Sequence, residues 1–231
     1  DRASTTLHTA QVAPLMARIE GARLLAPDRP GGGGSEGFDY RGVDLRRHAV
    51  AWLAQVLDAL EVESAVFVAN SMGAHWTTWF ALEHPARVRG IAALGMPAFL
   101  LDTSAPVPLR LLGKEPIGRL MMALDPPSPA QARRLWTMMG HPEASVTPEL
   151  VELTAALGEA PSYPQTFRSL LGACLRLSGA APGMSIDAAQ LAALAMPIAF
   201  GLSPSDPFGA LQVAEAAARH APDATVSVAG V

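Results

Sequence analysis

The strongest constraint on the fold is an alternation of short apolar runs with helical stripes. Residues 65–70 read AVFVAN, a run rich in β-branched side chains, and residues 88–95 form a second apolar run. Residues 43–60 and 72–84 carry apolar side chains at helical spacing, and each of these stripes precedes one of the runs. This rhythm predicts the α/β class, with a mostly parallel sheet and helices on both of its faces.

The same pattern extends toward both ends of the chain. Residues 22–27 read ARLLAP and predict a buried strand, which a loop of four consecutive glycines at residues 31–34 closes. The alternation resumes late in the sequence, with strands expected at residues 197–202 and 224–229 and a helix at about residues 209–220. We therefore expect one sheet built from segments that lie far apart in the sequence.

The middle of the chain has a different rhythm, with helical segments separated by Pro and Gly and without a strand candidate. These helical segments are expected at residues 108–123, 129–139, 148–158, 163–178 and 186–195. A helical insertion between sheet strands is typical of a cap over a site at the carboxyl edge of the sheet. The predicted organisation is therefore an α/β core of residues 1–96 and 196–231, with a helical cap of residues 97–195.

Composition excludes several classes of protein. The chain of 231 residues has 17 Lys and Arg against 21 Asp and Glu, so a nucleic-acid partner or an anionic membrane surface has no electrostatic support. Half of the residues are hydrophobic and 16% are charged, which excludes a disordered chain. We expect no internal disulfide, since Cys174 is the only cysteine, and no membrane span, so a cytoplasmic location is the default. A homo-oligomer remains open.

Ser71 is the candidate nucleophile. It stands between a predicted strand and a predicted helix in the sequence ANSMG, where small neighbours such as Gly73 let the chain turn sharply and expose the hydroxyl. Asn70 and Gly73 would shape this elbow, and the backbone N–H of Met72 at the helix N-terminus could bind a developing oxyanion. The alternative is a serine that merely caps the helix.

Asp206 is the candidate acid. It follows the strand expected at residues 197–202 in the sequence GLSPSDPFG, at the same sheet edge as Ser71, where a carboxylate could orient a histidine. An ordinary Asp-Pro turn is the alternative. Asp102, which follows the preceding strand, is a weaker candidate for the same role.

Taken together, these segments resemble the α/β-hydrolase family. The likeness rests on LLAPDRPGGGGS, VANSMG, HPARVRGIAAL and SDPFG, which occur in the family's order. It implies a cofactor-free serine hydrolase with a Ser-His-Asp triad and an acyl-enzyme, acting on a small apolar ester or acyl substrate. Esterases are the first expectation. Carbon–carbon bond hydrolases of aromatic ring-cleavage products, and a non-catalytic relative that binds a small ligand, are the alternatives.

Two parts implied by the resemblance have no match within the sequence. The family's histidine follows the last strand, so it is expected beyond Val231, and the loop that completes the oxyanion hole precedes a helix that residues 6–19 resemble. We interpret both chain ends as truncated. The histidines present are interpreted as packing or surface residues; they are His8, His48, His75, His84, His141 and His220.

Other chemistries have weaker support. The glycines at residues 32, 34 and 37 match a dinucleotide-binding pattern, but no helix begins directly after them. No phosphate-binding P-loop, HExxH or CxxC motif occurs, so no metal site is expected. Five side chains of the predicted cap could line an adaptable apolar pocket or simply form core. They are Met121, Met122, Trp136, Met138 and Met139.

Overall fold

The computed structural model describes residues 18–95, 99–203, 206 and 211–228. The chain divides into two compact units. The sheet unit comprises Gly42–Arg110 and Ala173–Val231, and the helical unit comprises Asp1–Arg41 and Leu111–Gly172. Helices α4 (Val107–Leu112) and α8 (Tyr163–Cys174) run across the boundaries between these segments. The expected division into residues 1–96 with 196–231 and a cap of 97–195 stays a prediction.

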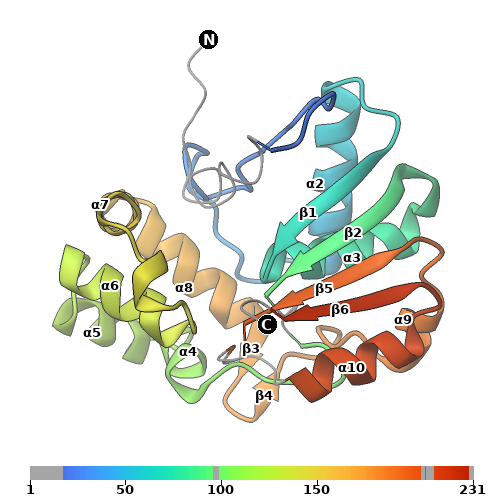
Figure 1. Cartoon of the computed structure of the whole chain (residues 1–231). Coiled ribbons are helices and arrows are strands. Elements are labelled where there is room, and N and C mark those ends of the chain that lie inside the picture. The colour runs from blue at the N-terminus through green and yellow to red at the C-terminus, as the bar shows by residue number, and fades with distance from the viewer. Residues whose placement is uncertain (1–17, 96–98, 204–205, 207–210, 229–231) are drawn as a thin grey trace. The chain divides into compact units, whose positions relative to one another are not determined.

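The sheet unit is built on four parallel strands in the order β1-β2-β5-β6 (Figure 1). The strands are β1 (Ala65–Asn70), β2 (Val88–Leu94), β5 (Ile198–Leu202) and β6 (Ala224–Val228). Within the described residues, each of these strands lies where the apolar runs predict it. Because they are parallel, their carboxyl ends meet at one edge of the sheet, and this edge is where a site is expected.

Helices connect these strands. They are α2 (Leu45–Ala59), α3 (Met72–Glu83), α9 (Ala188–Ala192) and α10 (Leu211–His220), with a 3-10 turn at Pro85–Arg87. Helix α2 begins where the Asp44 side chain accepts a hydrogen bond from the N–H of Arg47, as an N-cap does. A capping box formed by Asp187 and Gln190 starts α9 in the same way.

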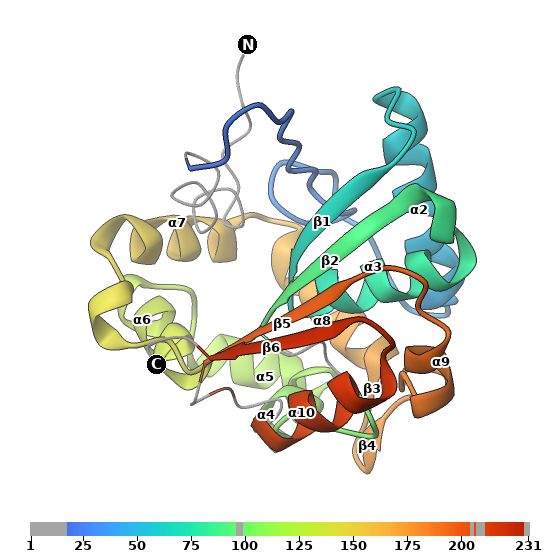
Figure 2. The same cartoon turned by 45° about the vertical axis from the view of Figure 1, so that its right-hand side comes forward.

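One face of the sheet is covered and the other is open among the described residues. Phe67, Ile91 and Ile198 are neighbours across three strands on the covered face, where α3 packs on β1 and β2, and α10 packs on β5 and β6. The opposite face exposes Val66 and Val68, which are 57% and 43% accessible. Figure 2 shows α3, α9 and α10 together beside the strands. The expected helices on both faces are therefore found on one face of the described sheet.

The prediction of a strand at residues 22–27 is wrong for the described structure. Within the described residues this segment forms no strand, and Leu24 and Leu25 are 38% and 40% exposed. An apolar run becomes a strand only where a neighbouring strand completes its hydrogen bonds, and a sequence pattern does not supply that neighbour.

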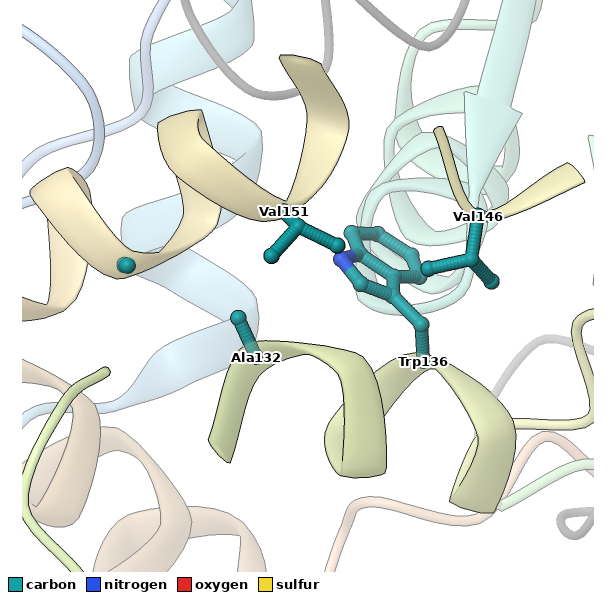
Figure 3. Packing of buried hydrophobic residues seen from close by; sticks show 5 residues of the cluster. Ala132, Trp136, Val146 and Val151 are labelled. Atoms are coloured by element: carbon teal, nitrogen blue, oxygen red, sulfur yellow. The ribbon is translucent and has the colours of Figure 1, made fainter. Parts of the chain in front are cut away.

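The helical unit contains α5 (Ile117–Leu124), α6 (Pro129–Met138) and α7 (Pro148–Glu159), with a 3-10 turn at Glu143–Ser145. Its compact core lies between α6 and α7, where Trp136 packs with Ala132, Val146, Val151 and Ala155 (Figure 3). The indole Nε1 of Trp136 donates a hydrogen bond of 2.8 Å to Thr154 Oγ1, so the polar end of this side chain is satisfied within the core. Trp136 is therefore a core residue of this helix pair.

Two expected helices differ in the structure. Residues 108–123 form α4 and α5 as separate helices, with Pro116 at the N-cap of α5. Between the two helices Gly113 passes α8 so closely that a Cβ would meet the backbone of residues 171 and 172. Helix α8 ends at Cys174, and residues 175–180 turn back as a small antiparallel pair, β3 (Leu175–Arg176) with β4 (Gly179–Ala180). Gly179 has a φ of +147°, which a glycine adopts without strain.

The glycine loop is held against α8. The hydroxyl of Thr166 accepts a hydrogen bond of 3.1 Å from Phe38 N, and that of Ser169 accepts one of 3.0 Å from Tyr40 N. Gly31 has a φ of +73°, and a Cβ there would lie 2.2 Å from Thr166 Cγ2. Gly31 is therefore required both by its backbone conformation and by the approach of the helix.

We expect Gly31→Ala to destabilise the protein by about 2 kcal/mol more than Gly21→Ala, as overpacking of a buried site does. Gly21 is a matched control, since its φ is +70° and no atom lies within 4 Å of the place that a Cβ would take. Urea unfolding at 25 °C measures the difference. Equal losses for the two variants would show that backbone strain alone matters at Gly31.

Candidate active site

Ser71 occupies a strained turn between β1 and α3. Its φ of 47° and ψ of −117° lie outside the regions that L-residues favour. Although Ser71 is at the N-cap position of α3, its side chain makes no capping hydrogen bond. The capping alternative is therefore not what the structure shows, and the hydroxyl is left for other chemistry. The role of nucleophile stays a prediction.

The elbow is fastened to the end of β2 through a single carbonyl. Leu94 O accepts a hydrogen bond of 3.2 Å from Ser71 N and one of 2.8 Å from Asn70 Nδ2. On the helix side, His75 N donates to Ser71 O at 3.2 Å and starts α3. The Asn70 side chain therefore ties the end of β1 to the end of β2. Its role in shaping the elbow stays a prediction.

The small residues around the elbow are less tightly required than the motif suggests. A Cβ on Gly73 would lie 3.8 Å from Ala69 Cβ, an ordinary van der Waals distance. This spacing shows that Ala69 and Gly73 fit beside each other without crowding. Met72 is the first residue of α3, so its N–H belongs to the turn whose amides have no acceptor within the helix. Its role as an oxyanion donor stays a prediction.

Asp206 lies at the same sheet edge as the elbow. The backbone N–H of Asp206 donates to Ser203 O at 3.1 Å, in the turn that follows β5. If Gly95 carried a Cβ, that atom would be 3.2 Å from Asn70 Nδ2 and 3.6 Å from Asp206 Oδ2. The fold therefore brings Asp206 and Asn70 to the side of Gly95 that would carry a side chain, although they are far apart in sequence.

Gly95 is the residue that sequence reasoning missed. The apolar run marks it only as the end of a strand, whereas its φ of +65° and its contacts place it inside the candidate site. A glycine directly after a buried strand is the signal that could have identified it.

Asp102, the weaker candidate for the acid, has another partner. Its carboxylate accepts a hydrogen bond of 2.8 Å from Ser185 Oγ, and its N–H donates to the same oxygen at 3.2 Å. Asp102 has a φ of 63° in a turn that these bonds hold. A carboxylate engaged in holding a turn is a poorer candidate for orienting a catalytic histidine. The role of Asp206 as the acid stays a prediction.

The described histidines lie against aromatic rings or at helix ends. The ring of His75, fully buried in α3, lies 4.2 Å from that of Trp79, measured between centroids. Burial lowers the pKa of His48, whose ring lies 5.9 Å from that of Trp76. The remaining placements are His84 beside Phe80, His141 beside Trp136 and His220 as the last residue of α10. His8 lies outside the described residues. The histidine beyond Val231 stays a prediction.

The second oxyanion donor also stays a prediction. The helix that residues 6–19 resemble lies almost wholly outside the described residues, as does the segment before it.

The glycine loop does not offer a phosphate site. The Asp28 carboxylate accepts a hydrogen bond of 2.9 Å from Gly34 N, and it lies 2.3 Å from where a Cβ of Gly33 would be. An anion already fills the inner side of the loop and would repel a phosphate. Helix α2 begins only at Leu45, so no helix N-terminus follows the loop directly. The dinucleotide alternative is therefore excluded by its geometry.

The described part of the chain also contains no cluster of three or more metal-ligating side chains. No helix in the ranges that the structure describes is both long and apolar enough to cross a membrane. Of the side chains considered for a cap pocket, Trp136 is buried core, Met138 is 48% exposed, and Met122 Sδ accepts a hydrogen bond from Arg168 Nη1.

Comparison with known proteins gives a consistent result. A family model described as the alpha/beta hydrolase fold matches residues 7–114. A 2-hydroxymuconate semialdehyde hydrolase of Pseudomonas sp. (strain CF600) is 32% identical over 156 residues, which are 65% of this chain and 49% of the relative. A 2-hydroxy-6-oxo-2,4-heptadienoate hydrolase of Pseudomonas putida is 29% identical over 154 residues, 65% of this chain and 50% of the relative. The chain thus spans about half the length of the curated relatives it matches.

Solved structures show the same fold. The meta-cleavage product hydrolase of Pseudomonas fluorescens IP01 has a TM-score of 0.73 at 18% identity, over 97% of this chain and 78% of that one. Carboxylesterase CesB of Bacillus subtilis has a TM-score of 0.66 at 16% identity, over 95% of this chain and 70% of that one.

Proposed function

We propose that the protein, which has the α/β-hydrolase fold, is a serine hydrolase that cleaves a carbon–carbon bond next to a carbonyl group in a small ring-cleavage product. The observation that carries the proposal is the elbow: Ser71 is strained, makes no capping bond, and lies beside the turn that Asp206 approaches. The named curated relatives, which are hydrolases of 2-hydroxymuconate semialdehyde and of a 2-hydroxy-6-oxodienoate, supply the substrate class.

The proposed reaction is an acyl transfer. Ser71 Oγ would bond to the carbonyl carbon while its proton passes to a histidine, which is expected outside residues 1–231. The N–H of Met72 would stabilise the oxyanion of the tetrahedral intermediate. The 2-hydroxydienoate would first tautomerise, losing the proton of its 2-hydroxyl and gaining one at the carbon next to the 6-carbonyl. Collapse of the tetrahedral intermediate would then break the carbon–carbon bond, with its electron pair spread into the conjugated fragment as a dienolate, and the histidine would return the proton to that fragment. Water activated by the same histidine would then release the acid from Ser71.

Asp206 has a supporting role in this scheme. Its carboxylate would hold the histidine in one tautomer and stabilise the cation formed during the reaction. The half-buried position of Asp206, at the edge of the sheet where β1 and β2 end, supports this assignment.

Ester hydrolysis, the first expectation, becomes the second candidate. The same nucleophile, acid and acyl-enzyme would serve it, with an alkoxide as the leaving group in place of an enolate. The likeness to a carboxylesterase supports only the fold. The substrate class therefore follows the carbon–carbon hydrolases among the curated relatives.

The test is a comparison of two substrates with the full-length protein. We expect kcat/KM for a 2-hydroxy-6-oxohexa-2,4-dienoate to exceed that for p-nitrophenyl acetate by at least about tenfold, since discrimination reflects differential binding of the transition state. Loss of the dienoate absorbance and release of p-nitrophenol measure the two rates. A reversed preference would favour the esterase. Failure of both substrates, without a fluorophosphonate adduct on Ser71, would favour a ligand-binding relative.

A further inference from the structure

Gly95 joins the ends of three strands at the candidate site. It follows β2 directly, and its N–H donates a hydrogen bond of 2.8 Å to Gly201 O in β5. The preceding carbonyl, Leu94 O, accepts from both Asn70 Nδ2 and Ser71 N at the end of β1. The Leu94–Gly95 turn therefore ties the nucleophile's elbow to the strand that leads to Asp206.

The side of Gly95 that would carry a side chain faces the two polar groups of the site. A Cβ would lie 3.2 Å from Asn70 Nδ2, closer than such atoms usually come, and 3.6 Å from Asp206 Oδ2. The φ of +65° adds a backbone cost for any other residue. An alanine at Gly95 would therefore have to move the Asn70 amide, and its methyl group would lie in ordinary van der Waals contact with Asp206 Oδ2.

We propose that Gly95 is a positioning residue, which sets the approach of the Asp206 carboxylate to the elbow that carries Ser71. The missing side chain leaves the room in which the carboxylate and the Asn70 amide face the same turn, and the bond to Gly201 keeps that turn in register with β5. This inference rests on the proposed function, because it acts through Asp206 as the acid of the triad.

The first test is Gly95→Ala in the full-length protein, assayed on the better of the two substrates above. The added methyl group would displace the Asn70 amide and fill the space beside the Asp206 carboxylate, and we expect it to lower kcat about tenfold and to leave KM within about twofold. The acid limb of kcat/KM is expected to move to lower pH, because a histidine that loses part of its carboxylate partner is deprotonated more easily. A purely structural role would not move this limb.

Gly183→Ala is the matched control for backbone strain. Gly183 lies in the same unit with a φ of +80°, and nothing lies within 4 Å of the place that a Cβ would take. We expect its kcat and pH profile to equal those of the unmodified protein. If Gly183→Ala reproduced the effects of Gly95→Ala, strain would explain them and the proposal would be wrong.

A double-mutant cycle with Asp206→Asn shows whether Gly95→Ala lowers kcat through the Asp206 carboxylate. In the Asp206→Asn background, Gly95→Ala should change the residual kcat by less than about twofold, because the group it positions is no longer charged. A tenfold loss in both backgrounds would overturn the proposal, as would an unchanged kcat for Gly95→Ala alone. Full activity of Asp206→Asn would instead refute the assignment of Asp206 as the acid of the triad in the proposed function.

Asn70→Ala is the substitute test if the Gly95→Ala variant does not fold. This substitution removes the side-chain amide that faces Gly95 and binds Leu94 O, and it introduces no strained residue. The expected result is again a lower kcat and an acid limb at lower pH, with neither effect in the Asp206→Asn background. A normal kcat and pH profile for Asn70→Ala would overturn the proposal.

Discussion

Ser71→Ala is expected to lower kcat of the full-length protein by at least about 10⁴-fold, because removal of the nucleophile of a serine hydrolase leaves only binding and oxyanion stabilisation. Substrate affinity is expected to change little. Steady-state rates with the dienoate substrate, together with fluorophosphonate labelling followed by intact-mass measurement, test the prediction. The labelled protein should carry one adduct on Ser71, and the variant none.

Stability separates this role from the capping alternative. Since the Ser71 side chain makes no capping bond, we expect Ser71→Ala to change the free energy of unfolding by less than about 0.5 kcal/mol, whereas loss of a true N-cap costs about 1 kcal/mol. Ser128→Ala is the matched comparison, because the Ser128 side chain does cap α6 through Gln131 N. A variant that keeps its turnover would refute Ser71 as the nucleophile, whatever its stability.

The second large effect is expected for Asp206→Asn. Removal of the carboxylate charge should lower kcat by about 10³ to 10⁴-fold, because the histidine loses both its orientation and the stabilisation of its cation. KM should change little, since the acid touches the histidine and not the substrate. Rates measured between pH 5 and pH 9 will show whether the loss persists where the histidine is fully deprotonated.

Asp102→Asn is the informative comparison. The Asp102 carboxylate accepts a hydrogen bond from the Ser185 hydroxyl and holds a turn. Its replacement is therefore expected to lower the midpoint of urea unfolding and to leave kcat within a few-fold of that of the unmodified protein. If Asp102→Asn abolished turnover while Asp206→Asn did not, the acid would be Asp102, and the assignment from the sheet edge would be wrong.

The local sequence pattern was sufficient to predict most strands and helices of the sheet unit. Strand β1 occupies the residues that its β-branched run predicts, and α3 begins directly after Ser71. These elements are coded by side-chain periodicity within a few residues, and the order of the motifs was sufficient to indicate the α/β-hydrolase fold. The candidate nucleophile and acid were found in the same way, since each follows a strand at the edge where parallel strands end.

Elements that depend on distant partners were not predicted. The apolar run at residues 22–27 has the composition of a strand, but its pairing depends on another strand. The division of residues 108–123 into two helices was also missed, although Pro116 stands at the N-cap of α5. The β3–β4 pair was hidden in a helical stretch, because two-residue strands carry too little periodicity to be recognised.

The sequence by itself determined the class of fold, the elbow around Ser71 and the edge on which Asp206 stands, because each follows from short-range patterns of side-chain size and polarity. Only the tertiary structure decided that Ser71 leaves its helix uncapped, that Ser185 holds Asp102, and that Gly95 faces both Asn70 and Asp206. These contacts join segments from different strands. Their distances depend on how the backbone packs across the sheet, which no local run of residues encodes.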